Sequence, residues 1–239
     1  MQDDNVKGKV KEFFEQVDDT VLLNQLSYTP RAPFYMEIQY RCLALALRSA
    51  ARRWLMSGSA VLDVGCGHGN LLRPLTNRYQ IFGVDLSIGL LRAAKAKGIR
   101  VCQCDAIALP FTEGQFDAVI CTEVMQHFPD PHPLLLELAR VCRPEGMLIL
   151  STLNKLSLVR HVFSLLSRRF ELGSLEVPII KRSARELSEA GSRCGWALQD
   201  ACWMLSPTAF TVYGRPPVQV RERLATNNIL LFTKAPRIS

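Results

Sequence analysis

The stretch VLDVGCGHGN at residues 61–70 decides the fold of this chain. Its apolar start predicts a short buried strand, which runs directly into Gly65-Cys66-Gly67-His68-Gly69. Glycines at these positions provide the positive φ angles of a tight turn and leave the main chain open to a ligand. Residues 69–79, GNLLRPLTNRY, have helical composition. The motif therefore predicts a strand, a glycine loop and a helix in succession.

The spacing of the glycines separates this loop from a nicotinamide dinucleotide site. The dinucleotide fingerprint is G-x-G-x-x-G, whereas the last glycine here comes one residue earlier. Asp63 stands just before the loop, where its carboxylate would repel a phosphate and suit an ammonium group. These two features disfavour a nicotinamide-dependent oxidoreductase.

Strands and helices alternate after this motif. Further strands are expected at 80–86, 99–105, 116–122 and 146–152, and further helices at 87–98 and 133–143. Ser87 can cap the start of a helix that Gly98 can close. Such alternation predicts an α/β fold, in which helices cover both faces of a parallel sheet.

The rest of the chain decorates a single domain of 239 residues. We expect the following parts: an N-terminal helical cap at 1–57, a ligand-binding core at 58–153, a lid and helix at 154–195, and closing strands at 196–239. Within the lid, residues 155–170 have apolar residues at helical spacing, with Lys and Arg at most other positions. This pattern suits a lid over a substrate cleft, and it also suits a helix lying on a membrane surface.

The composition is that of a soluble globular protein. Hydrophobic residues make up 48% of the chain, and no apolar run approaches the roughly 20 residues that span a bilayer. The start lacks the apolar region of a secretory signal, so we expect a cytoplasmic protein. The eight cysteines show no C-x-x-C pair and no zinc-site spacing, which favours free thiols.

The net charge of +7 arises in the C-terminal part of the chain. Residues 151–239 hold 13 Lys and Arg against 6 Asp and Glu, whereas residues 1–150 hold 16 of each. A basic surface can meet an acidic substrate, an anionic membrane or nucleic acid, and it can also simply be solvated.

Two further acids follow the next expected strands. Asp85 stands twenty residues after Gly65, where a carboxylate can accept hydrogen bonds from ribose hydroxyls, and Asp105 can meet an adenine amino group. Ligands of open α/β sheets bind outside the carboxyl ends of the strands, so Asp63, Asp85 and Asp105 point to one site. The alternative for each acid is a cap on the following helix.

With this glycine loop and these three acids, residues 58–153 resemble the class I S-adenosylmethionine-dependent methyltransferases of the methyltransferase type 11 group. The segments VLDVGCGHGN, GVDLS, CDAIALPF, FDAVICTEVMQHF and RPEGMLILST carry the resemblance. It implies a Rossmann-like sheet of seven strands, mostly parallel with the last antiparallel, and a lid inserted after the fifth strand. It also implies S-adenosyl-L-methionine as cofactor, bound by Asp63, Gly65, Cys66, Gly67, Gly69, Asp85, Leu86, Asp105, Ala106 and Thr122.

The likeness extends to ubiquinone-biosynthesis O-methyltransferases through ICTEVMQHFPDP at 120–131 and STLNK at 151–155. It implies an enzyme that transfers a methyl group to a small apolar or aromatic acceptor, quinol- or lipid-like, with O-methylation favoured. A phenolic hydroxyl has an ordinary pKa of about 10, so its attack gains from a base. His127, with an ordinary pKa of about 6.5, is the candidate base. Glu123 would orient it or accept a hydrogen bond from the substrate.

The chain departs from the O-methyltransferase pattern at one position. That pattern places acid-x-x-acid-His after the fourth strand, whereas this chain has Gln126 in place of the second acid. Gln126 weakens a divalent-cation site, so we assign no metal. Two other functions stay open: a tRNA wobble-uridine-type methyltransferase, and a scaffold that keeps the fold without catalysis. No RNA-binding module is evident, so the expected partner is a small molecule, with membrane contact through 155–170 possible in addition.

Overall fold

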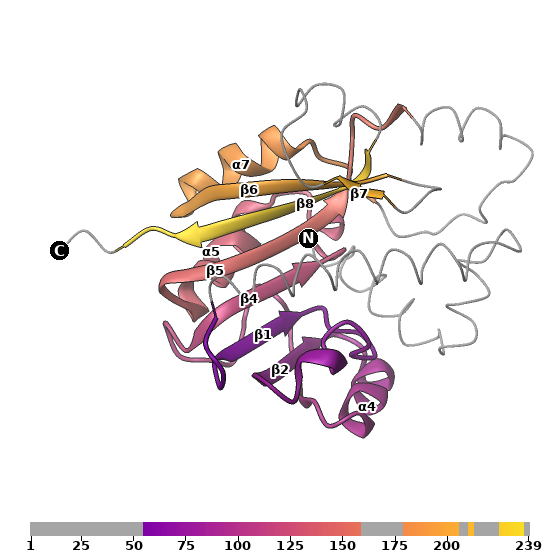
Figure 1. Ribbon diagram of the computed structural model, residues 1–239, viewed down its shortest axis with the longest axis vertical. Coiled ribbons are helices and arrows are strands. Elements are labelled where there is room, and N and C mark those ends of the chain that lie inside the picture. Colours follow the sequence, from indigo (N-terminus) through magenta and orange to yellow (C-terminus); the bar gives the residue numbers. More distant parts are fainter. Residues whose placement is uncertain (1–54, 159–178, 206–209, 213–224, 237–239) are drawn as a thin grey trace, which may run out of the picture.

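A twisted sheet forms the centre of the molecule (Figure 1). The computed structural model describes residues 55–158, 179–205, 210–212 and 225–236. The strands are β1 (Ala60–Val64), β2 (Gln80–Asp85), β3 (Arg100–Gln103), β4 (Phe116–Thr122), β5 (Cys142–Leu153), β6 (Trp196–Leu205), β7 (Phe210–Val212) and β8 (Ala225–Lys234). They lie in the order β3-β2-β1-β4-β5-β8-β6-β7. The first five pair in parallel, and β8 runs antiparallel to both β5 and β6.

The predicted fold class is confirmed, with one addition. All seven expected strands are present, and the last of them in the chain, β8, is antiparallel as the resemblance implied. The short strand β7 pairs with β6 and adds an eighth strand at the edge of the sheet. The sequence analysis did not predict β7.

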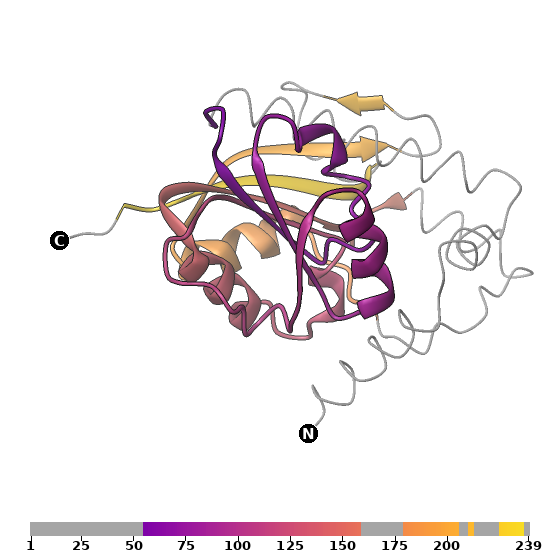
Figure 2. The same cartoon turned by 90° about the horizontal axis from the view of Figure 1, so that it is seen from below.

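Two helices pack on one face of the sheet. Figure 2 shows α5 (His132–Val141) and α7 (Ala184–Arg193) on the same side. Leucines of both helices join one core with Trp196 and Phe232, and the Trp196 indole donates a hydrogen bond to the carbonyl of Leu135 at 3.0 Å. This core fixes α5 between the loop that follows β4 and the closing strands.

A second core lies on the opposite face. Its strand residues alternate along the chain with those of the first core and so point to the other face. It also includes residues just before the 3-10 helix η1 (Arg73–Leu75) and a residue of α4 (Ile88–Ala96). Its members include Leu71, Leu72, Ala94, Ile120 and Ile149. The sheet is therefore covered on both faces, as an α/β fold requires.

The expected helix caps are present. The Ser87 hydroxyl accepts a hydrogen bond from the Leu90 amide at 3.3 Å, and Gly98 follows α4 with φ of 83°. At the start of α7, Ser183 and Glu186 bond reciprocally in a capping box. The sequence signal of Ser87 thus marks the start of α4 correctly, whereas the capping box of α7 was not predicted.

The helix predicted at residues 69–79 is wrong. The structure contains only the three-residue 3-10 helix η1 there. Pro74 has no amide hydrogen to donate and disfavours helical geometry at the residue before it. The Tyr79 amide then bonds to the Leu75 carbonyl, which closes a turn and leads straight into β2.

Two predicted parts fall outside the described residues. These are the N-terminal cap, apart from its last residues, and most of the helix predicted at 155–170. In the part of the chain that the structure describes, no helix is both long and apolar enough to cross a membrane.

Candidate active site at the carboxyl edge of the sheet

The glycine loop leaves the end of β1 and is tied to β2. The amides of Gly65 and Cys66 both donate to the Val84 carbonyl, at 2.8 and 3.0 Å. The Cys66 side chain is buried against Gly83, where an added Cβ would lie 2.7 Å from the sulfur. Burial raises the pKa of this thiol. The Cys66 sulfur is therefore turned into the protein interior.

Gly65 and Gly67 both have positive φ angles, but their surroundings differ. Gly65 has φ of 74°, and a Cβ there would collide with the Val124 side chain. Gly67 has φ of 52°, and no described atom lies within 4 Å of the position its Cβ would take. Gly65 thus brings the glycine loop into contact with the loop after β4, whereas the space beside the Gly67 Cα is open among the described residues.

Asp85 closes the loop from the side of β2. Its Oδ2 accepts a hydrogen bond from the Gly67 amide and its Oδ1 one from the Ser87 amide, both at 2.9 Å. Burial raises the pKa of this carboxyl, while these main-chain hydrogen bonds act in the opposite direction. The next residue, Leu86, is half-buried, and its carbonyl accepts from Gln103 at 2.7 Å.

Asp63 lies beneath the loop and is 1% exposed. Its Oδ1 has no hydrogen-bond partner, and burial, followed by repulsion from Asp85, raises its pKa to about 8. A buried carboxyl in this state is a strong candidate for a cationic or hydrogen-bond-donating ligand.

The other predicted cofactor residues occupy the same edge. Asp105 follows β3 and accepts from the Ile107 amide at 3.1 Å, and Ala106 packs on the core. Thr122 ends β4 and is half-buried. Gly69 faces α4 and Ile99, where an added Cβ would collide with the Ile99 side chain. Gly69 therefore serves close packing between loop and helix.

Strand register places several of these side chains on one face of the sheet. Asp63 pairs with Gly83 in β2 and Ile120 in β4, so Asp85 and Thr122, each two residues further on, share its face. The same registration continues to β5 and β8, where Thr122 pairs with Ser151 and Leu153 pairs with Asn227.

Glu123 begins the loop after β4 in a strained conformation. Its φ is 58°, although it is not glycine. Its amide donates to the Ser151 carbonyl at 3.1 Å. Its Oε1 accepts from the Ser151 hydroxyl at 2.9 Å and from the Asn227 amide nitrogen at 3.0 Å. Two neighbouring strands thus fix the direction of this carboxylate.

His127 ends the short 3-10 helix η2 (Met125–His127) in the same loop. Burial lowers its pKa to about 4. From the sequence we expect an ordinary pKa of about 6.5 for this histidine. The structure differs because burial removes water from the imidazole, and the sequence alone gives no measure of this burial. In the folded protein the imidazole is neutral at pH 7 and able to accept a proton.

Arg182 holds this loop from behind. Its guanidinium donates to the carbonyls of Met125, Phe128 and Pro129, at 3.0 and 2.8 Å for the first and last. It is 7% exposed, and its own carbonyl accepts from the Asn228 amide nitrogen at 3.0 Å. A buried guanidinium that satisfies main-chain carbonyls fixes the path of the loop that carries His127.

The side chain of Gln126, which replaces the second acid of the O-methyltransferase pattern, is buried. The main-chain carbonyl of Gln126 accepts a hydrogen bond from the Ile180 amide at 2.8 Å. Across the ranges that the structure describes, no group of three or more His, Cys, Asp or Glu side chains could hold a metal ion.

Sequence reasoning missed three residues of this edge: Ser151, Arg182 and Asn227. The available signal was weak. Asn227 and Asn228 are polar residues near the start of a largely apolar strand, and Arg182 is the second of two cations, after Lys181, directly before the capping residue Ser183. Only the strand order brings them beside the loop after β4.

Comparison with known proteins identifies the core. A family model for the methyltransferase domain matches residues 62–150. The ubiquinone biosynthesis O-methyltransferase of Xanthomonas oryzae pv. oryzae is 38% identical over 109 residues, which cover 42% of this chain and 45% of the relative. The chain contains a class I S-adenosylmethionine-dependent methyltransferase domain.

The similarity has a defined extent. The ubiquinone biosynthesis O-methyltransferase of Bordetella bronchiseptica is 36% identical over 108 residues, which cover 42% of this chain and 45% of the relative. The match thus spans about half the length of the curated relatives. Among solved structures, magnesium protoporphyrin IX methyltransferase of Synechocystis PCC 6803 has a TM-score of 0.67 at 17% identity, covering 91% of this chain and 100% of that one. A possible histamine N-methyltransferase of Thermotoga maritima has a TM-score of 0.63 at 17% identity, covering 89% and 98%. These structures support the fold alone.

S-adenosyl-L-methionine is the methyl donor of this family. The groups at the edge of this methyltransferase domain are chemically suited to it. The Asp85 carboxylate can accept from ribose hydroxyls, and the unpartnered Asp63 oxygen suits an ammonium group. The open space beside the Gly67 Cα leaves room for close approach.

Proposed function

We propose that this protein transfers a methyl group from S-adenosyl-L-methionine to a hydroxyl of a small apolar or aromatic acceptor. The observation that carries the proposal is the contact between two loops. Val124 lies against Gly65, so the loop with Glu123 and His127 adjoins the glycine loop. A methyl donor on one loop and an acceptor on the other would then meet at the carboxyl edge of the sheet.

Ten residues are proposed to hold the cofactor: Asp63, Gly65, Cys66, Gly67, Gly69, Asp85, Leu86, Asp105, Ala106 and Thr122. Asp85 would bind the ribose and Asp63 the ammonium group, while Gly65, Cys66 and Gly67 present main chain. Gly69 would contribute indirectly, by holding the loop against α4. When bound, the cofactor supplies a sulfonium methyl group that is open to attack.

His127 is the proposed base. Because burial lowers its pKa to about 4, the imidazole is unprotonated at neutral pH. It takes the proton of the acceptor hydroxyl as the oxygen bonds to the methyl carbon. The carbon–sulfur bond breaks in the same step, and its electron pair stays on sulfur. Glu123 is proposed to hold the acceptor.

The quinol-like character of the acceptor rests on the relatives. Two matched enzymes are named for O-methylation in ubiquinone biosynthesis. We extend this to an apolar, hydroxyl-bearing acceptor and to a cytoplasmic protein that touches a membrane surface through residues 155–170. The basic composition of residues 151–239 is compatible with such contact.

The test is to incubate the protein with methyl-labelled S-adenosyl-L-methionine and a cell extract, then to separate organic, aqueous and RNA fractions. Label in the organic fraction is expected, and His127→Ala should abolish most of it while leaving cofactor binding intact. Label in RNA would contradict the proposed acceptor and favour the tRNA-modifying alternative. Cofactor binding without transfer to any fraction would favour a scaffold.

A further inference from the structure

The polar cluster of Glu123, Ser151 and Asn227 begins beside Thr122, which is assigned to the cofactor, and extends away from Asp63 and Asp85. Strands in a sheet lie about 4.8 Å apart. In the order β2-β1-β4-β5-β8, Asn227 on β8 is therefore about 14 Å from β1 and about 19 Å from β2. This distance separates Asn227 from Asp63 and Asp85, whereas Glu123 after β4 and Ser151 on β5 lie nearer to them.

Glu123 is held in place at the expense of backbone strain. A non-glycine residue in the left-handed region is strained and persists where its surroundings fix it. Here the surroundings are the Ser151 main chain and two donors on a single carboxylate oxygen, at 2.9 and 3.0 Å. The loop thus turns a carboxylate toward this point in one orientation.

Asn227 contributes an acceptor that the protein leaves unmatched. The side chain is 1% exposed, and its Nδ2 donates to Glu123. An ionised carboxylate only accepts, so the amide orientation is fixed with Oδ1 turned elsewhere. That Oδ1 has no hydrogen-bond partner. A buried acceptor without a donor destabilises the protein, and a ligand that brings a donor removes this cost.

Asn228 shows why the face of the sheet matters. It is equally buried, and its Oδ1 also lacks a partner. It pairs with Thr152 on the opposite face, where its Nδ2 donates to the Arg182 carbonyl at 3.0 Å. Asn228 therefore stabilises the segment that carries Arg182. Asn227 instead lies on the same face of the sheet as Thr122 and Ser151, and its side chain bonds to Glu123.

We infer that Asn227 and Glu123 form the subsite that binds a neutral hydrogen-bond donor of the methyl acceptor, a hydroxyl or N–H beside the reacting group, with Ser151 as its positioning residue. This inference rests on the proposed function. An acceptor with a carboxylate or phosphate at this point would face the Glu123 charge and is excluded. The subsite thus selects among acceptors by the presence of a donor group.

The test uses two probes that keep the same reacting hydroxyl and alkyl tail. 4-Hexylcatechol carries a second hydroxyl, and 4-hexyl-2-methoxyphenol carries a methoxy group in its place. For the wild-type protein, kcat/KM should favour the diol at least tenfold, because an unmatched buried acceptor costs about 1.4 kcal/mol or more. In Asn227→Ala this preference should fall below about threefold, with an unchanged KM for S-adenosyl-L-methionine.

Asn228→Ala is the matched control. It should lower the melting temperature and keep the wild-type preference between the probes. Because the preference is a ratio, it does not depend on the folded fraction of any variant. An unchanged ratio in Asn227→Ala, or an equal change in Asn228→Ala, overturns the subsite while the proposed function stands.

Two further outcomes are decisive. If the wild-type protein labels the extract and neither probe, the neutral-donor class is wrong. If it labels nothing, the proposed function fails and the subsite fails with it.

Discussion

At the scale of single residues, Asp63 places opposite demands on folding and on binding. Its carboxyl is buried, with a pKa of about 8 against an ordinary value of 3.8. The folded state therefore keeps a proton that the unfolded state releases between about pH 4 and pH 8. Stability from this group is present below pH 4 and is lost as pH rises toward 8.

Replacing Asp63 with Asn should remove this dependence. We expect Asp63→Asn to raise the free energy of unfolding at pH 8 by on the order of 2 kcal/mol, with little effect at pH 4. The same change should weaken S-adenosylhomocysteine binding, since the carboxylate is lost. Urea unfolding at both pH values and calorimetric binding are the measurements. A variant less stable than wild type at pH 8 would contradict the assignment.

His127 gives a second prediction that depends on pH. With a pKa of about 4 the imidazole is unprotonated throughout the neutral range. Titration of His127 should therefore not change kcat/KM between pH 6 and 8, and should lower it below about pH 5. His127→Asn should lower kcat by roughly 10²–10⁴ and remove the acidic limb. Labelled transfer to the extracted acceptor measures both. A wild-type limb near pH 6.5 that disappears in His127→Asn would show a solvated histidine instead.

At the scale of elements, the loop after β4 depends on the segment that leads into α7. Arg182 is the connection, because it donates to three carbonyls of residues 125–129 and is itself held by Asn228. Burial lowers the pKa of this guanidinium. Removal of the side chain takes this donor from all three carbonyls, of which Met125 keeps the Phe128 amide at 3.2 Å.

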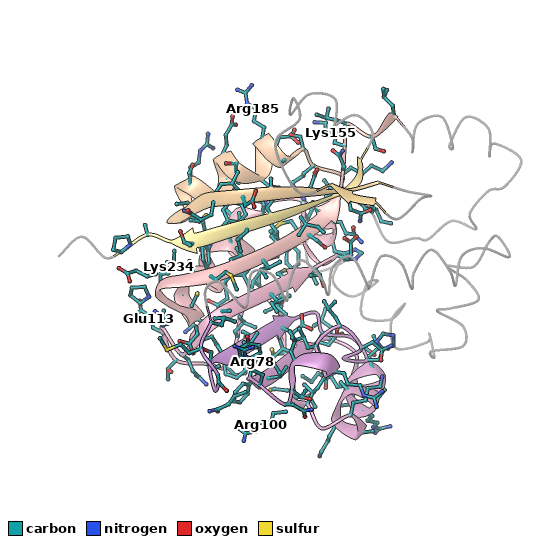
Figure 3. The ribbon with its side chains drawn as sticks, in the orientation of Figure 1. Arg78, Arg100, Glu113, Lys155, Arg185 and Lys234 are labelled. Atoms are coloured by element: carbon teal, nitrogen blue, oxygen red, sulfur yellow. The ribbon has the colours of Figure 1, made fainter. Side chains whose placement is uncertain are left out.

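Arg182→Met should therefore lower the free energy of unfolding by about 3 kcal/mol. For a chain of this size the melting temperature should fall by about 6–12 °C. Arg185→Met is the control, because Arg185 is exposed on α7 and pairs only with Glu189 in the described contacts (Figure 3). Its melting temperature should match wild type. Equal melting temperatures for both variants would show that the Arg182 contacts do not stabilise the loop.

The strands were the most predictable elements. Short apolar runs gave β1, β2 and β4 to within a residue or two, because buried parallel strands need continuous apolar sequence. The helix after β1 failed at Pro74, where one residue outweighs the composition around it. The glycine loop and the acids after the strands were predictable for a similar reason, because their roles are local.

Ser151, Arg182 and Asn227 were not predictable in the same way. Each acts through a partner at least 28 positions away in the chain, as Asn227 does with Glu123. Such contacts depend on β8 inserting between β5 and β6. The desolvation that lowers the pKa of His127 is likewise a property of the assembled fold.

At the scale of the whole molecule, the two ends of the sheet have different roles. Lys155 marks the carboxyl edge, where the candidate site lies, and Lys234 and Glu113 mark the other end (Figure 3). The cluster of polar groups at one edge and the apolar cores between them follow the general rule that open α/β sheets bind ligands at the carboxyl ends of their strands.

The uneven charge of the chain predicts surface binding. If residues 155–170 contact anionic lipid, the triple change Arg160→Gln, Arg168→Gln and Arg169→Gln should weaken binding to phosphatidylserine vesicles at least tenfold, at about 1 kcal/mol for each charge. Arg73→Gln, Arg92→Gln and Lys95→Gln remove the same charge from the balanced part and should have a smaller effect. Vesicle flotation measures both. Equal loss in the two triple variants would contradict a local contact.

The most direct test of the account is calorimetric titration of the protein with S-adenosylhomocysteine. The account predicts one binding site, with Asp85→Ala weakening the affinity at least tenfold, because the ribose hydroxyls lose their acceptor. Asp200→Asn changes an exposed acid on β6 and should bind as wild type does. No binding by the wild-type protein, or equal affinity in Asp85→Ala, would contradict the assignment of the cofactor to this edge of the sheet.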